Sequence, residues 1–105
     1  MKKALFLLLL PLLALAGPKE TVKIKTSAIC EMCKERIEKN LALTKGVAKS
    51  DLNLDDKVIT VEYDAGKIDA AGIRKAISET GYDADEMKAV AKSYSKLPSC
   101  CKKKE

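Results

Sequence analysis

Four cysteines carry the most informative chemistry in this 105-residue chain, and two of them form a C-x-x-C pair at Cys30 and Cys33. This spacing places both sulfurs on the first turn of an expected helix, close enough to share one ion. The free N–H groups and the dipole at the start of a helix favour negative charge, which lowers the pKa of a thiol there. The pair therefore suits two kinds of chemistry, which are binding of a soft metal ion and dithiol–disulfide exchange.

The available ligand types favour Cu(I). The chain contains no histidine, and thiolates are soft ligands that suit Cu(I). Two thiolates give Cu(I) or Hg(II) an acceptable low-coordinate site, and low coordination lets a partner's cysteines enter and take the ion. Zinc in a structural site usually has four protein ligands, so Cys30 and Cys33 alone would leave it half-coordinated. We expect Cu(I), with Hg(II) or Zn(II) as the alternatives.

A second pair, Cys100 and Cys101, lies near the end of the chain. It could fold back and add thiolates to the first pair, form a second metal site alone or in a dimer, or be oxidised. We favour the first alternative, because residues 90–99 are long enough to cover the return along a six-residue strand, which is about 20 Å. A site with four thiolates would bring Zn(II) or a copper cluster back as candidates.

The elements that must position these cysteines can be predicted from hydrophobic periodicity. Residues 21–26 alternate between apolar and charged side chains, which predicts a half-buried strand. Residues 31–43 then follow a helical pattern, with Cys33, Ile37 and Leu41 on one face. The pattern thus predicts a strand that leads into the C-x-x-C pair and a helix that begins with it.

The next segments predict a hairpin and a second helix. Residues 47–54 and 58–63 are expected to be strands joined by a turn, and the second contains the clearest strand pattern in the chain. Asp69 is the expected N-cap and Gly81 the expected C-cap of a helix between them.

The end of the chain is less regular. Residues 84–89 are the expected final edge strand, and residues 90–97 are expected to form a short helix closed by Pro98. The predicted fold is α+β, a ferredoxin-like βαββαβ unit with a four-stranded antiparallel sheet and two helices on one face. A short C-terminal tail with two cysteines follows it.

The first residues form a pattern of their own. A basic start, an apolar run over 4–13 and an A-x-A site at 14–16 are typical of a secretory signal peptide. The run is too short to cross a bilayer, which takes about 20 residues. We therefore expect a signal peptide at 1–16, the domain at 17–89 and an extension at 90–105. The protein is then secreted across the inner membrane to the periplasm, with no stable membrane insertion after cleavage; the alternative is an N-terminal helix of the domain.

The segment from Thr21 to about Met87 resembles a heavy-metal-associated domain, the type found in copper chaperones, copper-transporting ATPases and the periplasmic mercury-binding protein. The resemblance rests on VKIKTSAICEMCKERIEKNL, GV, VITVEYD and AISETGYDA. It implies that Cys30 and Cys33 bind the metal and that Tyr82 lies beside the metal loop. It also implies a metal-donor or metal-acceptor partner, such as a metal-transporting ATPase or efflux component.

One part of the metal loop departs from the pattern of that family. The usual Gly-Met-Thr before the first cysteine is Ser27-Ala28-Ile29 here. The family methionine packs beneath the loop, so its replacement removes no ligand but alters what holds the loop rigid. Met32, between the two cysteines, is expected to point to solvent.

Several function classes are disfavoured by what the sequence lacks. No basic patch with interleaved aromatic residues is present, so nucleic-acid binding is not expected. There is no Ser/His/Asp set, Gly-rich phosphate loop or acid/base carboxylate pair, so we do not expect an enzyme.

A dithiol/disulfide redox protein is the alternative, although the strand order lacks a thioredoxin-like start and no proline precedes a strand. A monomer or a metal-bridged dimer is expected, and carrying, buffering or sensing of the ion remain open.

Overall fold

The computed structural model describes residues 18–102, which form a small antiparallel sheet covered by helices. The elements in chain order are β1 (Lys19–Lys25), α2 (Glu31–Ala42), β2 (Val47–Asn53), β3 (Val58–Asp64), α3 (Ala70–Thr80), α4 (Ala91–Ser95) and the 3-10 turn η1 (Ser99–Cys101). The predicted signal peptide at 1–16 lies outside the described residues. Within the described part, no helix is both long enough and apolar enough to cross a membrane.

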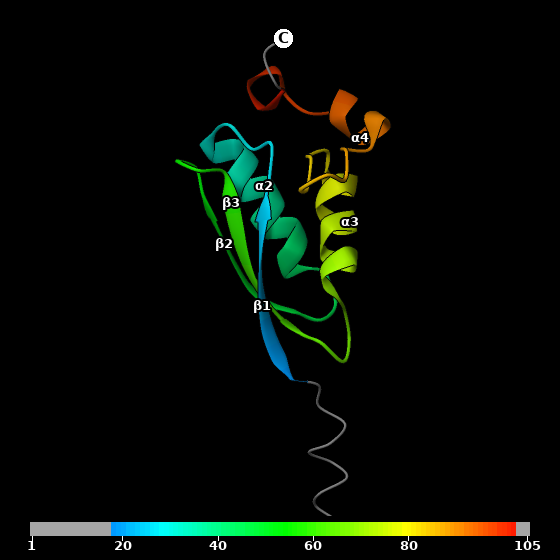
Figure 1. The fold of residues 1–105 in the computed structure, drawn as a ribbon. Coiled ribbons are helices and arrows are strands. Elements are labelled where there is room, and N and C mark those ends of the chain that lie inside the picture. Colours follow the sequence, from blue (N-terminus) through cyan, green and yellow to red (C-terminus); the bar gives the residue numbers. More distant parts are fainter. Residues whose placement is uncertain (1–17, 103–105) are drawn as a thin grey trace, which may run out of the picture.

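The sheet has the order β1-β3-β2, and both pairs are antiparallel. Helices α2 and α3 pack against each other, and Figure 1 shows them on the same face of the sheet. This arrangement confirms the ferredoxin-like fold that the order of the elements predicted. The sheet face and the two helices enclose a single hydrophobic core.

The predicted apolar faces are the faces that the fold buries. On β3, Ile59 and Val61 are fully buried and Tyr63 nearly so. On α2, the residues at four-residue spacing, Cys33, Ile37 and Leu41, have no exposed surface. A strand buries alternate residues and a helix every third or fourth, so these two patterns meet across the core.

Helix α3 begins and ends where its capping residues predicted. The Asp69 carboxylate accepts a hydrogen bond from the Gly72 N–H at 2.8 Å. Gly81 ends the helix in the left-handed conformation with φ 115°, which only glycine adopts without steric cost.

The prediction of a fourth strand over 84–89 was wrong. Among the described residues the sheet has three strands, and Ala84 makes only an isolated bridge to Thr26. After Ala84 the chain turns through Asp85, whose φ is 55°, and Ala84 and Met87 exchange two backbone hydrogen bonds of 2.8 and 3.0 Å. The turn contacts β1 at Lys25 and then closes on itself, so the ladder does not continue.

The short helix predicted over 90–97 is present as α4. It packs against α3, and the Val90 N–H donates to the Ser78 carbonyl at 3.0 Å. Figure 1 shows α4 and η1 at the end of the molecule where α2 begins. The tail therefore returns toward the C-x-x-C pair.

Candidate metal centre

The loop that precedes the first cysteine is held by side-chain hydrogen bonds. The Thr26 hydroxyl donates to the Lys57 carbonyl at 2.9 Å and accepts from the Ala28 N–H at 3.2 Å. The Ser27 hydroxyl accepts from the Asp83 N–H at 2.9 Å, which ties the loop to the turn after α3. Polar contacts to the turn before β3 and to the turn after α3 thus support a loop that lacks the methionine of the family pattern.

Cys30 and Cys33 lie side by side at the start of α2. Cys30 is the N-cap residue with an extended backbone, and Cys33 is on the first turn. Their sulfurs are 3.1 Å apart, and Cys33 is fully buried whereas Cys30 is half-buried. A hydrogen bond from the Cys33 thiol lowers the pKa of Cys30 to about 7, although burial acts in the opposite direction. This places a ready thiolate beside a second thiol at a helix start.

The second cysteine pair lies against the first. The Cys101 sulfur is 3.7 Å from the Cys30 sulfur, and Cys101 is only 1% exposed. The Cys100 sulfur is 4.0 Å from that of Cys101, and the sulfurs of Cys30, Cys100 and Cys101 all lie within 4.8 Å of one another. Burial raises the pKa of Cys101 to about 12, and the neighbouring Cys33 thiol adds to the rise. The arrangement therefore gathers four thiols at one end of the molecule.

A methionine extends this cluster of sulfurs to the surface. Met32 is exposed, as its place between the cysteines predicted, and its sulfur is 3.8 Å from that of Cys100. Spacing along the chain could not have predicted this contact, because the two residues are 68 positions apart.

Tyr82 lies beneath the thiols. Its side chain is fully buried, and its hydroxyl has no hydrogen-bond partner among the residues that the structure describes. Burial raises the pKa of Tyr82, and the thiols of Cys101 and Cys33 add to the rise because they are its neighbours. A buried hydroxyl without a partner costs stability, so this donor is available to a group that enters or changes charge at the site.

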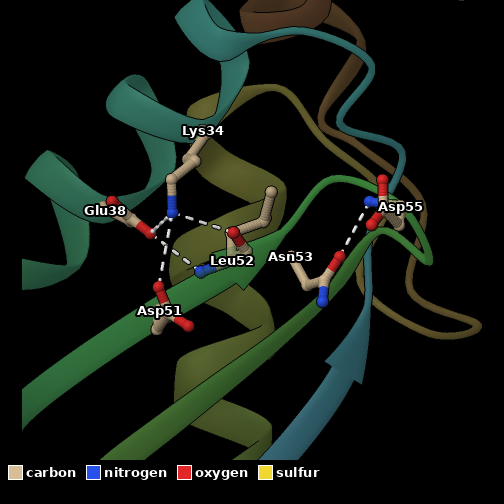
Figure 2. Close-up of polar contacts among 6 residues, drawn as sticks. All are labelled: Lys34, Glu38, Asp51, Leu52, Asn53 and Asp55. Carbon is tan, nitrogen blue, oxygen red and sulfur yellow. Dashed lines mark hydrogen bonds and ion pairs between the residues drawn. The ribbon is translucent and has the colours of Figure 1, made fainter.

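Helix α2 is fixed to the sheet by two charged side chains at i,i+4 spacing. Figure 2 shows Lys34 and Glu38 facing Leu52 on the edge strand β2. The Glu38 carboxylate accepts from the Leu52 N–H at 2.8 Å, and the Lys34 ammonium donates to the Leu52 carbonyl at 2.8 Å.

The same two residues form an ion pair of 2.7 Å, which raises the pKa of Lys34. Asp51 is a more distant partner of Lys34 at 3.4 Å. These contacts hold the helix that carries Cys30 and Cys33 in one position on the sheet.

Comparison with known proteins finds a matching domain family and similar sequences and structures. The model of the heavy-metal-associated domain matches residues 21–83. The copper chaperone CopZ of Staphylococcus epidermidis is 39% identical over 54 residues, which are 51% of this chain and 79% of that protein.

Two solved structures illustrate the likeness. The N-terminal domain of a potential copper-translocating P-type ATPase from Bacillus subtilis, solved in the Cu(I)-loaded state, is 28% identical with a TM-score of 0.61. The match covers 65% of this chain and 86% of that domain. Oxidized MerP from Ralstonia metallidurans CH34 is 23% identical with a TM-score of 0.62, over 65% of this chain and 96% of its own, and shares the fold.

Proposed function

This chain belongs to the heavy-metal-associated domain family, and from that premise we propose that it is an exported carrier of Cu(I). It holds the ion between the thiolates of Cys30 and Cys33 and hands it to a partner. The single observation that carries the proposal is the 3.1 Å separation of the two sulfurs at the start of α2. Two donors at one helix start leave the ion open to a further ligand from outside.

Ligand chemistry supports copper over harder ions. The described donors around Cys30 are sulfur atoms, which suit Cu(I). The relative from Staphylococcus epidermidis is a copper chaperone, and the Bacillus subtilis domain was solved in the Cu(I)-loaded state. Hg(II) binds the same low-coordinate thiolates and is the alternative cargo of the same site.

We also propose that the partner presents its own thiolates, as an ATPase domain or an efflux component with a C-x-x-C pair would. The likeness to the domain of a potential copper-translocating ATPase supports this choice. Export to the periplasm rests on the signal-like pattern at 1–16. The relative from Staphylococcus epidermidis is a copper chaperone, and we assign this chain no catalytic role.

Two specific observations favour second candidates. The gathering of four thiols would satisfy the four-ligand preference of structural Zn(II). The lowered pKa of Cys30 would serve dithiol–disulfide exchange. A competition series with Zn(II) and Hg(II), and the reduction potential of the Cys30–Cys33 pair, separate these candidates from a Cu(I) carrier.

The decisive test is an anaerobic titration of the reduced protein with Cu(I) against a chromophoric chelator. The Cys30→Ser/Cys33→Ser double variant is run beside it, and Glu35→Gln, an exposed change on the same helix, is the matched control. We expect tight one-to-one binding that is lost in the cysteine variant and kept in the control. Absence of competitive binding in the unmutated protein would refute the copper proposal.

A further inference from the structure

The segment of residues 97–102, called here the latch, folds back over the start of α2 (Figure 1). Its first residue, Leu97, is 6% exposed and joins the core. The absence of a side chain at Gly81 makes room for it, because a Cβ there would lie 3.2 Å from the Leu97 side chain. Packing therefore sets where the latch begins.

The end of the latch is equally defined. Pro98 precedes η1, and the Cys101 N–H donates to the Pro98 carbonyl at 2.9 Å. The Lys102 N–H donates to the Ser99 carbonyl at 3.2 Å. This turn points the Cys101 side chain inward, where it is 1% exposed and belongs to the core.

We propose that the latch supplies the Cys101 thiolate as a third ligand to the ion held by Cys30 and Cys33. The inference rests on the proposed function and deepens it. With metal–sulfur bonds of about 2.3 Å, sulfurs around one ion lie about 4.6 Å apart in a linear site, about 4.0 Å in a trigonal one and about 3.8 Å in a tetrahedral one. The 3.7 Å between the sulfurs of Cys30 and Cys101 is close to the values for sites with more than two ligands, whereas the 3.1 Å between those of Cys30 and Cys33 must lengthen when the ion enters.

The buried hydroxyl of Tyr82 fits the same assignment. It has no hydrogen-bond partner among the described residues, and its neighbours are the thiols of Cys101 and Cys33. When Cu(I) binds, each thiol releases its proton to solvent and its sulfur becomes a charged acceptor; no electron is transferred. Tyr82 can then donate to a metal-bound thiolate, which gives the orphan donor a partner in the loaded protein.

The latch also controls how the ion leaves. In a two-thiolate site the position of the third ligand is open to a partner's thiolate. Here Cys101 occupies that position from within the chain. In transfer, the bond from Cu(I) to the incoming thiolate forms, the bond to the Cys101 sulfur breaks, and Cys101 takes up a proton as the latch lifts.

Cys100 provides a matched control for Cys101 because it is the adjacent residue with the same chemistry. It is exposed, and its sulfur lies between those of Met32 and Cys101 at 3.8 and 4.0 Å. Cys101, by contrast, is buried against Cys30. The assignment therefore predicts unequal effects from two neighbouring substitutions.

The experiment compares Cys101→Ser and Cys100→Ser in the reduced full chain under anaerobic Cu(I) titration. Cys101→Ala is added as a second variant, and circular dichroism checks that each variant folds. We expect both Cys101 variants to weaken Cu(I) binding by at least the ~10-fold that loss of a partner around a metal ligand typically costs. They should also lose the ion to the chelator faster, and X-ray absorption should show one sulfur ligand fewer. Cys100→Ser should weaken binding less than either Cys101 variant does.

Other outcomes would overturn the inference. If the folded Cys101 variants keep the affinity, release rate and sulfur count while Cys30→Ser/Cys33→Ser loses binding, the latch is not a ligand and the proposed function stands. An equal loss in Cys100→Ser would refute the assignment to Cys101. If the unmutated protein does not bind Cu(I), both proposals fail together.

Discussion

At the scale of single residues, the two thiols of the C-x-x-C pair have different environments. Cys33 is fully buried in the core, whereas Cys30 is half-buried at the helix start and has its pKa lowered to about 7. At neutral pH a substantial fraction of Cys30 is thiolate, and the Cys33 thiol stabilises it by donating a hydrogen bond over 3.1 Å. Cys30 is therefore the sulfur best prepared to meet an incoming ion.

This difference predicts how the metal-free protein reacts with iodoacetamide. Alkylation of Cys30, measured by mass spectrometry of its peptide, should rise with pH around a midpoint of about 7. Cys33→Ala removes the hydrogen-bond donor and should move the midpoint toward the ordinary thiol pKa of about 8.5. A midpoint near the ordinary value in the unmutated protein would contradict the stabilising role of Cys33.

At the scale of elements, polar groups bind the backbone of one residue on each edge strand of the sheet. On the β2 edge, Glu38 and Lys34 bind the N–H and carbonyl of Leu52. On the β1 edge, Asp85 binds both backbone polar groups of Lys25. Its carboxylate accepts from the Lys25 N–H at 2.9 Å, and its own N–H donates to the Lys25 carbonyl at 2.8 Å. These contacts occupy edge positions that could otherwise pair with another chain, and each contact also fixes a segment that leads to the thiols.

The β2 contact predicts a stability effect for Glu38→Ala. Its removal leaves the Leu52 N–H without its partner and the Lys34 ammonium without its nearest carboxylate. We expect a loss of about 1–2 kcal/mol in the free energy of unfolding, measured in urea. Glu35→Ala, on the exposed side of the same helix, should change it by less than about 0.5 kcal/mol. Equal effects of the two variants would argue against the contact.

The β1 contact predicts a pH dependence. Burial alone would raise the pKa of Asp85, but hydrogen bonds from the Lys25 N–H and from the Arg74 guanidinium at 2.9 Å outweigh it and lower the pKa below its ordinary value. The folded protein therefore binds this proton less tightly than the unfolded chain. The contribution to stability is full above the ordinary pKa of about 3.9 and is lost as the pH falls through the lowered one.

Asp85→Asn tests this directly, because asparagine tolerates the positive φ but carries no charge. At pH 6 the variant should be less stable by about 1–2 kcal/mol, and the difference should shrink as the pH falls toward 2. Asp55→Asn, in the exposed turn before β3, is the control for removal of a surface carboxylate. A difference that stays constant with pH would mean that the charge of Asp85 is not responsible.

At the scale of the whole molecule, the metal centre and the core are one cluster. Cys33 and Cys101 belong to the same set of buried residues as Ile59 on β3. Two of the four thiols are therefore held by the packing that stabilises the fold. Ligand positions depend on the core, and the latch depends on it through Leu97.

This connection predicts the effect of a core change far from the thiols in sequence. Ile59→Ala should lower the free energy of unfolding by about 2–5 kcal/mol, since Ile59 is fully buried on the central strand. Thermal unfolding of the metal-free protein measures it. Where the variant remains folded, its Cu(I) affinity should fall as well, because the same packing holds the Cys33 and Cys101 sulfurs in place. An unchanged affinity in folded Ile59→Ala would contradict this connection.

The sequence by itself determined the parts that follow from local periodicity and capping. The apolar spacing of Cys33, Ile37 and Leu41 predicted α2 and its buried face, and Asp69 and Gly81 predicted the limits of α3. These signals are local, since each depends on residues a few positions apart. The order of the elements was then sufficient for the ferredoxin-like fold.

Only the tertiary structure decided the contacts between distant residues. The predicted strand over 84–89 is a tight turn, because Asp85 alone binds both the N–H and the carbonyl of Lys25. The approach of Cys101 to Cys30 spans 71 positions and depends on where Leu97 packs, and sequence analysis left it as one of three alternatives. Such contacts depend on long-range packing, which the periodicity of a single segment does not encode.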